Sequence, residues 1–232
     1  MTDFADLLGD EPAWERCACG TLSARVPCWE CVREAEARVE AARETGPRGI
    51  PARYRWAHLD APELRTRVHV ALGSERDPAA VGRRLAASQS VAVALIGPSG
   101  GGKTSLAVAA MREVRGALFV PARELERARI GHRAGDGEAP LVEACMRAPL
   151  LVIDDLGQDK PHALSAVEAV ILARHESERR TWITTGLDSA SRSGYPELEA
   201  RYGAGVARRL TERGTGAVLR FAGPGEQLGM GG

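Results

Sequence analysis

A phosphate-binding loop is the clearest chemical signal in the sequence. Residues 97–104 read GPSGGGKT, which is the spacing G-x-x-x-x-G-K-T. Glycines in this pattern let successive backbone N–H groups turn inward around a phosphate. Lys103 can then reach the β and γ phosphates of a nucleotide, and the Thr104 hydroxyl can ligate Mg²⁺. The predicted nucleotide-binding residues of this loop are Gly97, Pro98, Ser99, Gly100, Gly101, Gly102, Lys103, Thr104 and Ser105.

Two carboxylates follow a second aliphatic stretch. Residues 150–153 are aliphatic and lead directly into Asp154 and Asp155. A buried parallel strand delivers the side chains at its carboxyl end to the ligand crevice of an α/β sheet. We expect Asp154 to hold Mg²⁺ and Asp155 to orient or deprotonate the attacking water. Two acids that merely form a turn are the alternative, which the phosphate loop upstream disfavours.

Four of the five cysteines form two close pairs near the N-terminus, Cys17 with Cys19 and Cys28 with Cys31. In a cytosolic chain, such pairs favour thiolate ligands of Zn²⁺ over disulfides. A structural Cys₄ zinc site would stabilise a segment too short and polar to form its own core. The first pair is spaced C-x-C where C-x-x-C is usual, so free or redox-sensitive thiols are the alternative. We expect the fifth cysteine, Cys145, to be a core residue.

Strand and helix patterns alternate around the phosphate loop and must position these side chains. The expected strands are 91–96, 117–120, 150–153, 181–187 and 216–222. The expected helices are 62–72, 78–88, 104–114, 122–130, 141–147, 161–179 and 196–213, the last interrupted by Gly203 and Gly205. This alternation predicts an α/β fold with a parallel sheet flanked by helices. The positive N-terminal end of the helix at 104 would face the phosphate.

Composition divides the chain into three expected parts. A length of 232 residues allows one sizeable α/β core and a small appendage. The stretch TGPRGIP at 45–51 interrupts the helix expected at 29–44 and marks a boundary. We therefore expect an N-terminal module with the zinc site at 1–50, the nucleotide-binding α/β core at 51–222 and a flexible tail at 223–232.

The charge balance restricts where nucleic acid could bind. Lys and Arg number 31, as do Asp and Glu, so any contact with nucleic acid needs a local patch. The first candidate patch holds Arg123, Arg127, Arg129 and Arg133. Glutamates interleave with these arginines, so a solvated helix face is the alternative. No apolar run approaches the roughly 20 residues that span a bilayer, and the acidic start lacks a basic signal region, so we expect a soluble, cytoplasmic protein without a membrane partner.

Aromatic and basic residues precede the first expected strand. Tyr54, Arg55 and Trp56 lie where residues of phosphate-loop proteins often flank an adenine ring. Packing of this approach segment onto the core is an equally good explanation.

Residues from about 50 to 222 resemble the AAA+ ATPases of the DnaC-type helicase loaders and the IstB-type transposition helpers. The segments that carry the resemblance are IPARYR at 50–55, GPSGGGKT at 97–104, LLVIDDLG at 150–157, TWITT at 181–185, RYG at 201–203 and ARRL at 207–210. The resemblance implies a five-stranded parallel sheet in an AAA+ ATPase core at 51–222, a partner-binding role for the N-terminal module at 1–50, and nucleotide-driven self-assembly or partner docking. In contrast to larger AAA+ proteins, we expect no C-terminal helical lid.

The resemblance also implies an arginine that acts across a subunit interface. Arg209 matches the family position, with Arg208 and Arg201 as substitutes, and a guanidinium added in trans would make hydrolysis depend on assembly. Arginines that simply face solvent are the alternative. Where the family usually has a polar sensor, this sequence has Gly186, so Thr185 is the candidate replacement.

The sequence thus predicts an ATP–Mg²⁺-dependent switch in which Lys103, Asp155 and Arg209 are catalytic. Asp155 is shorter than the glutamate of many relatives, which suits slow, assembly-dependent hydrolysis. The expected partner is a replicative helicase or a transposase-type protein, with single-stranded DNA and a homo-oligomer as further expectations. The alternatives are an IstB-like transposition helper, a nucleotide-binding adaptor that never hydrolyses ATP, and a small-molecule kinase whose substrate lid would be 123–133.

Overall fold

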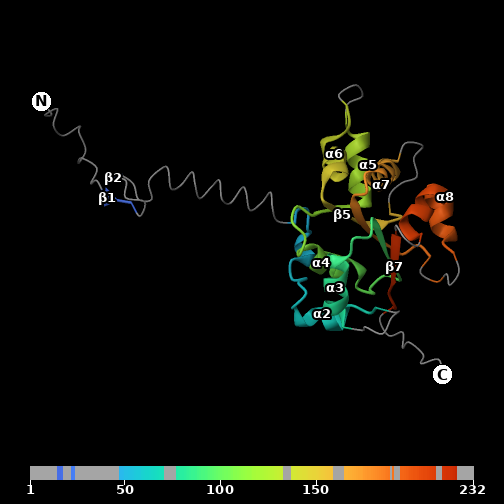
Figure 1. The fold of residues 1–232 in the computed structure, drawn as a ribbon, viewed down its shortest axis with the longest axis horizontal. Helices are drawn as coiled ribbons and strands as arrows, with labels where there is room; N and C mark the ends of the chain where they lie inside the picture. The colour runs from blue at the N-terminus through green and yellow to red at the C-terminus, as the bar shows by residue number, and fades with distance from the viewer. Residues whose placement is uncertain are drawn as a thin grey trace, which may run out of the picture. The chain divides into compact units, whose positions relative to one another are not determined.

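Five parallel strands lie side by side at the centre of the larger unit of the chain (Figure 1). The computed structural model describes residues 15–17, 22–23, 47–70, 77–132, 137–158, 165–188, 190, 194–212 and 216–223. The chain divides into two compact units, Met1–Thr45 and Gly46–Gly232.

The sheet has the strand order β4-β5-β6-β3-β7, and every neighbouring pair is parallel. Its strands are β3 (Ala92–Ile96), β4 (Leu118–Pro121), β5 (Leu150–Leu156), β6 (Arg180–Thr185) and β7 (Gly216–Arg220). Numbered within the sheet along the chain, this order is 2-3-4-1-5. Because the strands are parallel, their carboxyl ends share one edge of the sheet. The predicted α/β fold with a five-stranded parallel sheet is confirmed.

Helices cover both faces of the sheet, which explains why its strands are continuous aliphatic runs. Alternate residues of β3 point to opposite faces, with Ala94 and Ile96 in one core cluster and Val93 and Leu95 in the other. The first face packs against α5 (Ala122–Ile130), α6 (Pro140–Arg147), α7 (Ala166–Glu176) and α8 (Pro196–Thr211). The second face packs against α2 (Pro62–Arg67), α3 (Pro78–Ala87) and α4 (Lys103–Met111).

Helix α2 ends well before the predicted residue 72. Val68 is extended, and the chain beyond it runs beside the end of β7, where Val70 forms an antiparallel bridge with Phe221. The backbone of His69 makes two hydrogen bonds: its N–H donates to the Gly101 carbonyl, and its carbonyl accepts from the Ala222 N–H. These long-range contacts override the helical pattern of the local sequence. The short turn η2 (Ala52–Tyr54) precedes α2.

Helix α8 is interrupted as the sequence predicts. Gly203 has φ 79° and ψ 156°, a conformation outside the helical region, so the two halves meet at a kink. Cys145 lies in the core, as expected, with no exposed surface. Burial raises the pKa of its thiol to about 12.

In the smaller unit, the structure describes one short antiparallel pair, β1 (Glu15–Arg16) with β2 (Leu22–Ser23). Cys17 is buried beside β1. Cys19, Cys28 and Cys31 lie outside the described residues, as do the helix expected at 29–44 and the tail beyond Gly223. Within the parts of the chain that are described, no three His, Cys, Asp or Glu side chains gather into a metal site. The zinc site therefore stays a prediction. None of the helices described is both long and apolar enough to cross a lipid bilayer.

Candidate nucleotide-binding site

The phosphate loop links the carboxyl end of β3 to the N-terminus of α4, as the sequence predicts. Gly102 is the N-cap of α4 and has φ 84°, in the left-handed region. A Cβ on this residue would lie 2.3 Å from the Arg67 carbonyl oxygen, so only glycine fits there. Gly97 is equally confined, because a Cβ would lie 2.7 Å from the Phe221 Cβ. Packing against α2 and the end of β7 therefore demands glycine at these two positions.

Lys103 is held against its own loop. Its Nζ donates to the carbonyl oxygens of Gly97 and Pro98, both at 2.8 Å. Burial lowers the pKa of Lys103, while the nearby carboxylates of Asp155 and Asp154 raise it. A cation is thus held at the N-terminal end of α4, where the helix dipole also favours an anion.

Asp154 lies at the end of β5 and is only 1% exposed. Its Oδ1 accepts hydrogen bonds from the hydroxyls of Thr104 on α4 and Thr184 on β6, both at 2.7 Å. Burial raises the pKa of Asp154 above its ordinary value of 3.8, and the two hydroxyls partly offset that rise. The structure therefore brings together the two residues that the sequence predicts as Mg²⁺ ligands, Thr104 and Asp154.

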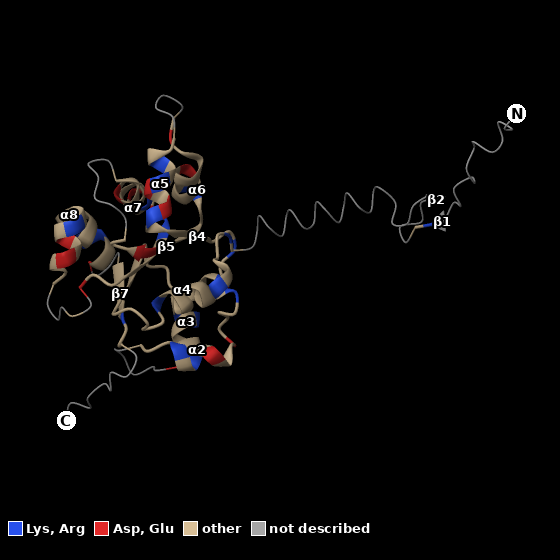
Figure 2. Cartoon of the chain, turned by 180° about the vertical axis from the view of Figure 1, so that it is seen from behind, with Lys and Arg blue, Asp and Glu red and all other residues tan. Residues whose placement is uncertain are grey.

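Asp155 differs from Asp154 in exposure and in backbone conformation. Its side chain is exposed, its φ is 54°, and its N–H donates to the Thr184 hydroxyl at 3.0 Å. A positive φ in a residue other than glycine is uncommon, and such residues cluster at functional sites. Figure 2 shows the acidic end of β5.

A cavity of about 800 Å³ opens beside the phosphate loop. Most of the predicted loop residues line it, namely Ser99, Gly100, Gly102, Lys103, Thr104 and Ser105, and Asp155 joins them. A smaller hollow of about 210 Å³ is lined by Arg53, Pro121, Ala122, Arg123, Asp154, Asp155 and Gln158. The two spaces share Arg53, Asp155 and Gln158.

The approach segment contributes to the larger cavity, although not with all the residues predicted. Tyr54 and Trp56 line it, whereas Arg55 is exposed and does not. Five further residues line this cavity that no motif in the sequence indicates: Arg53, Thr66, Arg67, His69 and Gln158. The Arg67 guanidinium stacks on the Trp56 ring at 4.8 Å from its centroid.

Thr185 does not line either space. Its hydroxyl donates to the Leu156 carbonyl at 2.7 Å and accepts from the Leu187 N–H at 3.0 Å, and the side chain is fully buried. Its neighbour Thr184 is the residue that contacts Asp154. Gly186, at the position of the missing polar sensor, lines the larger cavity.

Arg209 lies at the opposite end of the strands from the phosphate loop. It lines a space of about 10 Å³ with Ala92 and Thr181, which stand near the starts of β3 and β6. Its guanidinium donates to the Gly205 carbonyl at 3.1 Å on the exposed side of α8. Arg208 is exposed on the same helix, and Arg201 is half-buried. The structure does not bring these arginines to the cavity of their own chain.

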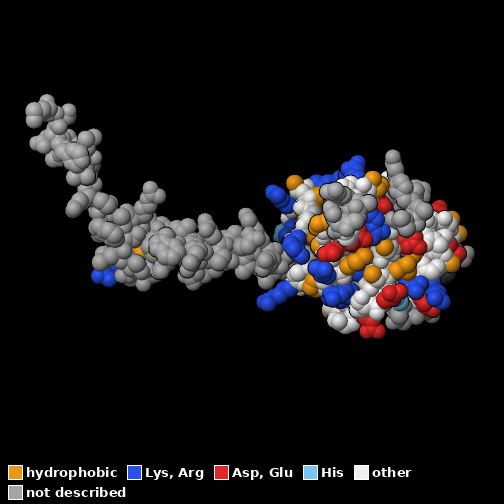
Figure 3. Space-filling model, turned by 90° about the horizontal axis from the view of Figure 1, so that it is seen from above, with side chains coloured by type: hydrophobic (Ala, Val, Ile, Leu, Met, Phe, Trp, Pro, Cys, Tyr) orange, Lys and Arg blue, Asp and Glu red, His pale blue; other side chains and the backbone are white. Residues whose placement is uncertain are grey.

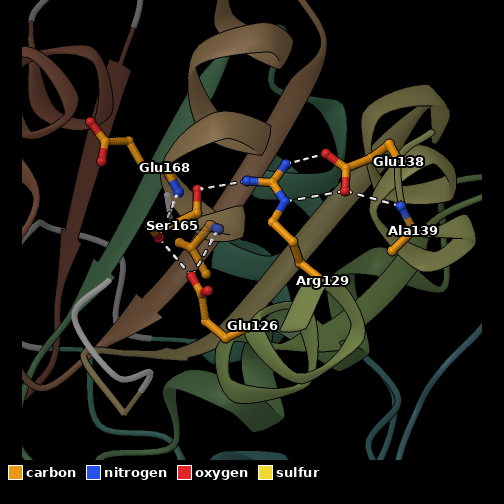
Figure 4. Close-up of polar contacts among 7 residues, drawn as sticks. Glu126, Arg129, Glu138, Ala139, Ser165 and Glu168 are labelled. Atoms are coloured by element: carbon orange, nitrogen blue, oxygen red, sulfur yellow. Dashed lines mark hydrogen bonds and ion pairs between the residues drawn. The ribbon is translucent and has the colours of Figure 1, made fainter. Parts of the chain in front are cut away.

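Of the four arginines proposed as a nucleic-acid patch, Arg129 is engaged in contacts within the protein. Arg129 pairs with the Glu138 carboxylate and donates to the Ser165 carbonyl at 3.2 Å (Figure 4). Arg123 instead lines the smaller hollow, and Arg127 is exposed. Arg133 lies outside the described residues.

The residues present fit a nucleotide and a magnesium ion. Mg²⁺ prefers hard oxygen ligands, and the Thr104 hydroxyl and the Asp154 carboxylate are such donors. The buried carboxylate gains from a cation, because burial disfavours its charged form. The glycine-lined loop, the Lys103 ammonium and the helix N-terminus suit the phosphates.

The sequence matches no protein-family model and no curated protein. The structure is similar to the DnaC helicase loader, with a TM-score of 0.58, 24% identity, and coverage of 74% of this chain and 99% of that chain. A protein assigned as a primosome component of Streptococcus pyogenes serotype M3 gives a TM-score of 0.53 at 16% identity, covering 78% of this chain and 94% of its own. AMPPCP-bound DnaA from Aquifex aeolicus gives 0.51 at 15%, covering 72% of this chain and 50% of its own.

The chain therefore has an α/β fold with the sheet order 2-3-4-1-5, and this fold resembles those of the DnaC helicase loader and of DnaA. At these identities the likeness concerns the fold. The chain is similar in fold to the DnaC helicase loader, as the resemblance in sequence predicts.

Proposed function

We propose that the chain is an ATP-binding and ATP-hydrolysing switch that loads or recruits a DNA-processing partner, as a DnaC-like helicase loader. The observation that carries this proposal is the 2.7 Å hydrogen bond between the Thr104 hydroxyl and the Asp154 carboxylate. It joins the helix after the phosphate loop to the acid at the end of β5, and these are the two parts with which phosphate-loop NTPases hold Mg²⁺ and triphosphate. The likeness in fold to the DnaC helicase loader supports the choice of partner class.

Each residue of the loop has a defined part in binding. The backbone N–H groups around Gly100 and Gly102 cradle the phosphates, and Lys103 neutralises the charge on the β and γ phosphates. Thr104 and Asp154 hold Mg²⁺, which would stabilise the charge that develops on the phosphates. Because Asp154 must be ionised to do so, its raised pKa makes Mg²⁺ affinity fall as the pH falls.

Asp155 orients or deprotonates the attacking water. Its carboxylate is exposed on the wall shared by the two spaces, where a water can reach both it and a terminal phosphate. Thr184 connects this residue to the metal site, since its hydroxyl donates to Asp154 and accepts from the Asp155 N–H. We therefore assign the link between the metal site and β6 to Thr184 in place of Thr185.

Hydrolysis becomes assembly-dependent if an arginine reaches the phosphate from a second copy of the chain. The position of Arg209 supports this arrangement, because Arg209 lies at the far end of the strands from its own cavity. Arg208 and Arg201 on the same helix are the other candidates. A guanidinium supplied in trans stabilises the charge on the transferred phosphoryl group.

The partner belongs to the DNA-processing proteins, such as a replicative helicase or a transposase. The proposed partner-binding module at 1–50 would meet it, with a zinc site at Cys17, Cys19, Cys28 and Cys31 as a structural support. An IstB-like transposition helper shares the ATP-binding chemistry and differs in the partner. Mass spectrometry of complexes captured with and without a non-hydrolysable ATP analogue would identify the partner and its nucleotide dependence.

The Asp155→Asn variant tests the hydrolytic switch. We expect its ATP turnover to fall by about 100-fold, the lower range for loss of a general base, while ATP binding persists. The matched control is Asp60→Asn, which alters an exposed acid on the surface. Wild-type protein that binds ATP but never hydrolyses it, with or without partner, would favour the nucleotide-binding adaptor.

A further inference from the structure

Arg53 stands where the two spaces of the site meet. It lines the 800 Å³ cavity together with Lys103 and Thr104, and the 210 Å³ hollow together with Asp154 and Asp155. Four other residues line the larger cavity but not the smaller hollow: Trp56, Thr66, Arg67 and His69. Arg53 therefore lies where the larger cavity meets the hollow that both strand-end carboxylates line, whereas these four residues line only the larger cavity.

The backbone around Arg53 is fixed onto the helix that follows the phosphate loop. The turn η2 closes through hydrogen bonds from Tyr54 to Pro51 and from Arg55 to Ala52, at 2.9 and 3.2 Å. Arg112, just beyond α4, donates to the carbonyl oxygens of Ala57 at 2.8 Å and Arg55 at 3.1 Å. The position of Arg53 relative to α4 is thus set before any ligand binds.

Within the described parts of the chain, the Arg53 guanidinium makes no hydrogen bond, so its N–H donors are available. It stacks on the Tyr54 ring, with Cζ 4.9 Å from the ring centroid. Stacking of this kind restricts the rotamers of an arginine without using its hydrogen-bond donors. Among the described residues, no carboxylate lies within ion-pair distance of Arg53, although its charge acts on Asp154 across the hollow.

We propose that Arg53 contacts the terminal phosphate of the bound nucleotide from within the same chain and makes the site prefer a triphosphate to a diphosphate. This inference rests on the proposed function, and it identifies Arg53 as the residue that distinguishes a bound triphosphate from a bound diphosphate. A triphosphate whose β and γ groups lie at Lys103 and Thr104 brings its last phosphate toward the Asp155 wall, next to Arg53. The guanidinium fork matches two phosphate oxygens, and it meets no such group when a diphosphate is bound.

Two neighbouring arginines provide internal comparisons. Arg55 belongs to the same turn but is exposed and lines neither space, so its side chain has no part in phosphate binding. Arg67 lines only the larger cavity and stacks on Trp56. A substitution of Arg67 should therefore weaken ATP and ADP binding by similar factors.

The test is the ratio of ATP to ADP affinity, measured by calorimetry with Mg²⁺ for the full chain and its variants. Arg53→Gln should weaken ATP binding by about 10- to 100-fold, the range for loss of a charge-assisted hydrogen bond, and ADP binding by less than about threefold. Arg53→Lys should retain part of the preference, since it keeps the charge and loses the fork. Arg55→Gln should match the wild type in both affinities.

An Arg53→Gln variant with the wild-type ratio of ATP to ADP affinity would overturn the inference, as would equal losses for the two nucleotides. Either result would leave the proposed function intact, because the wild type would still bind ATP. Failure of the wild type to bind ATP would instead remove the proposed function itself. Arg53 is exposed, so we expect each variant to keep the wild-type melting temperature.

Discussion

The chemistry of the site depends on a carboxylate that the fold removes from water. Asp154 is nearly fully buried. Hydrogen bonds from the hydroxyls of Thr104 and Thr184 replace part of the hydration that its carboxylate loses. Neutral hydroxyls only partly replace the lost hydration of a charged group. The folded chain therefore gives up some stability at this residue and gains a strong attraction for a cation.

Replacing Asp154 by asparagine should stabilise the free protein and abolish its Mg²⁺-dependent ATP binding. The Oδ1 atom of asparagine can still accept from both hydroxyls, and the variant buries no charge, so we expect a gain at pH 7 on the order of 1 kcal/mol in the free energy of unfolding. Because the pKa of Asp154 is raised in the folded state, its favourable contribution is complete below about pH 3.8 and is lost as the pH rises through the folded-state pKa. The advantage of the variant should thus grow with pH.

Urea unfolding of the wild type and Asp154→Asn between pH 5 and pH 8 measures this difference. Asp60→Asn, at an exposed acid, serves as the control and should change stability by less than about 0.5 kcal/mol. An Asp154→Asn protein that is less stable than the wild type at pH 7 would contradict the account of this residue.

Two glycines with nearly the same positive φ allow the packing of the phosphate loop to be tested. Gly102 has φ +84° and Gly137 has φ +85°, but only Gly102 is crowded, by the Arg67 carbonyl oxygen. Gly137→Ala should lose about 1 kcal/mol of stability through strain alone and bind ATP normally. Gly102→Ala should cost a similar backbone strain. Its Cβ would also collide with the Arg67 carbonyl oxygen, so the loop must shift, and we expect ATP affinity to fall at least about tenfold. Equal ATP affinities in calorimetry would refute a loop held by packing.

At the scale of elements, buried polar side chains fix how helices meet the sheet. Arg174 on α7 is fully buried and donates to the carbonyl oxygens of Cys145 and Ala148 at 2.7 and 2.8 Å, and to the Thr181 hydroxyl at 2.9 Å. Burial lowers its pKa to about 10, so the guanidinium stays charged at neutral pH. This one side chain thereby provides hydrogen-bond donors for carbonyl oxygens at the C-terminal end of α6, and it joins α7 to β6.

Arg174→Met should be strongly destabilising. The substitution keeps much of the side-chain volume but leaves several buried carbonyl oxygens without donors, so we expect a loss of about 3–5 kcal/mol. Arg179→Met is the matched control, because the Arg179 side chain is exposed and, among the described residues, donates one hydrogen bond, to the Arg147 carbonyl. Its cost in urea unfolding should stay below about 0.5 kcal/mol. A small loss for Arg174→Met would show that water can replace the guanidinium.

A second network anchors the start of α7 to α5 (Figure 4). The buried Glu126 carboxylate accepts from the Ser165 hydroxyl at 2.6 Å and from the Val167 N–H at 3.2 Å. Ser165 is the N-cap of α7 and accepts from the Glu168 N–H at 3.2 Å. Glu126 therefore has a structural role, which the mixed-charge pattern of the sequence did not reveal.

The sequence could predict the features that depend on local pattern. The strands were predictable because a strand buried on both faces is a continuous aliphatic run, and the loop at 97–104 because its spacing is contiguous. The sequence could not identify Arg53, Arg67 and His69 as cavity residues, because the fold of the approach segment over the sheet edge decides their positions. The choice between Thr184 and Thr185 needed the register of β6 against β5, which shifts between Ile153 and Leu156.

At the scale of the whole molecule, acidic and basic residues are equal in number but are not evenly distributed over the surface. Figure 3 shows one face of the larger unit, on which basic side chains gather mostly toward one edge. Helices α5 and α8 carry both signs of charge (Figure 2). Partner contacts are therefore expected to be local and sensitive to ionic strength.

If an arginine acts in trans, turnover per chain should rise with protein concentration. We expect Arg209→Ala to remove most of this rise and to leave ATP affinity unchanged, because Arg209 lies far from the cavity of its own chain. ATPase assays over a range of concentrations would show it, with Arg179→Ala as an exposed-arginine control. If the variant keeps the wild-type concentration dependence, Arg208 or Arg201 must take the role.

Calorimetric titration of the full chain with ATP and Mg²⁺ tests the central claim most directly. We predict saturable binding near one nucleotide per chain, which disappears in Lys103→Ala and weakens when Mg²⁺ is chelated. Lys103→Ala removes the cation held at the loop by the carbonyl oxygens of Gly97 and Pro98. Folded wild-type protein that takes up no ATP, or that binds it equally well after Lys103→Ala, would contradict the nucleotide site on which the rest of the account depends.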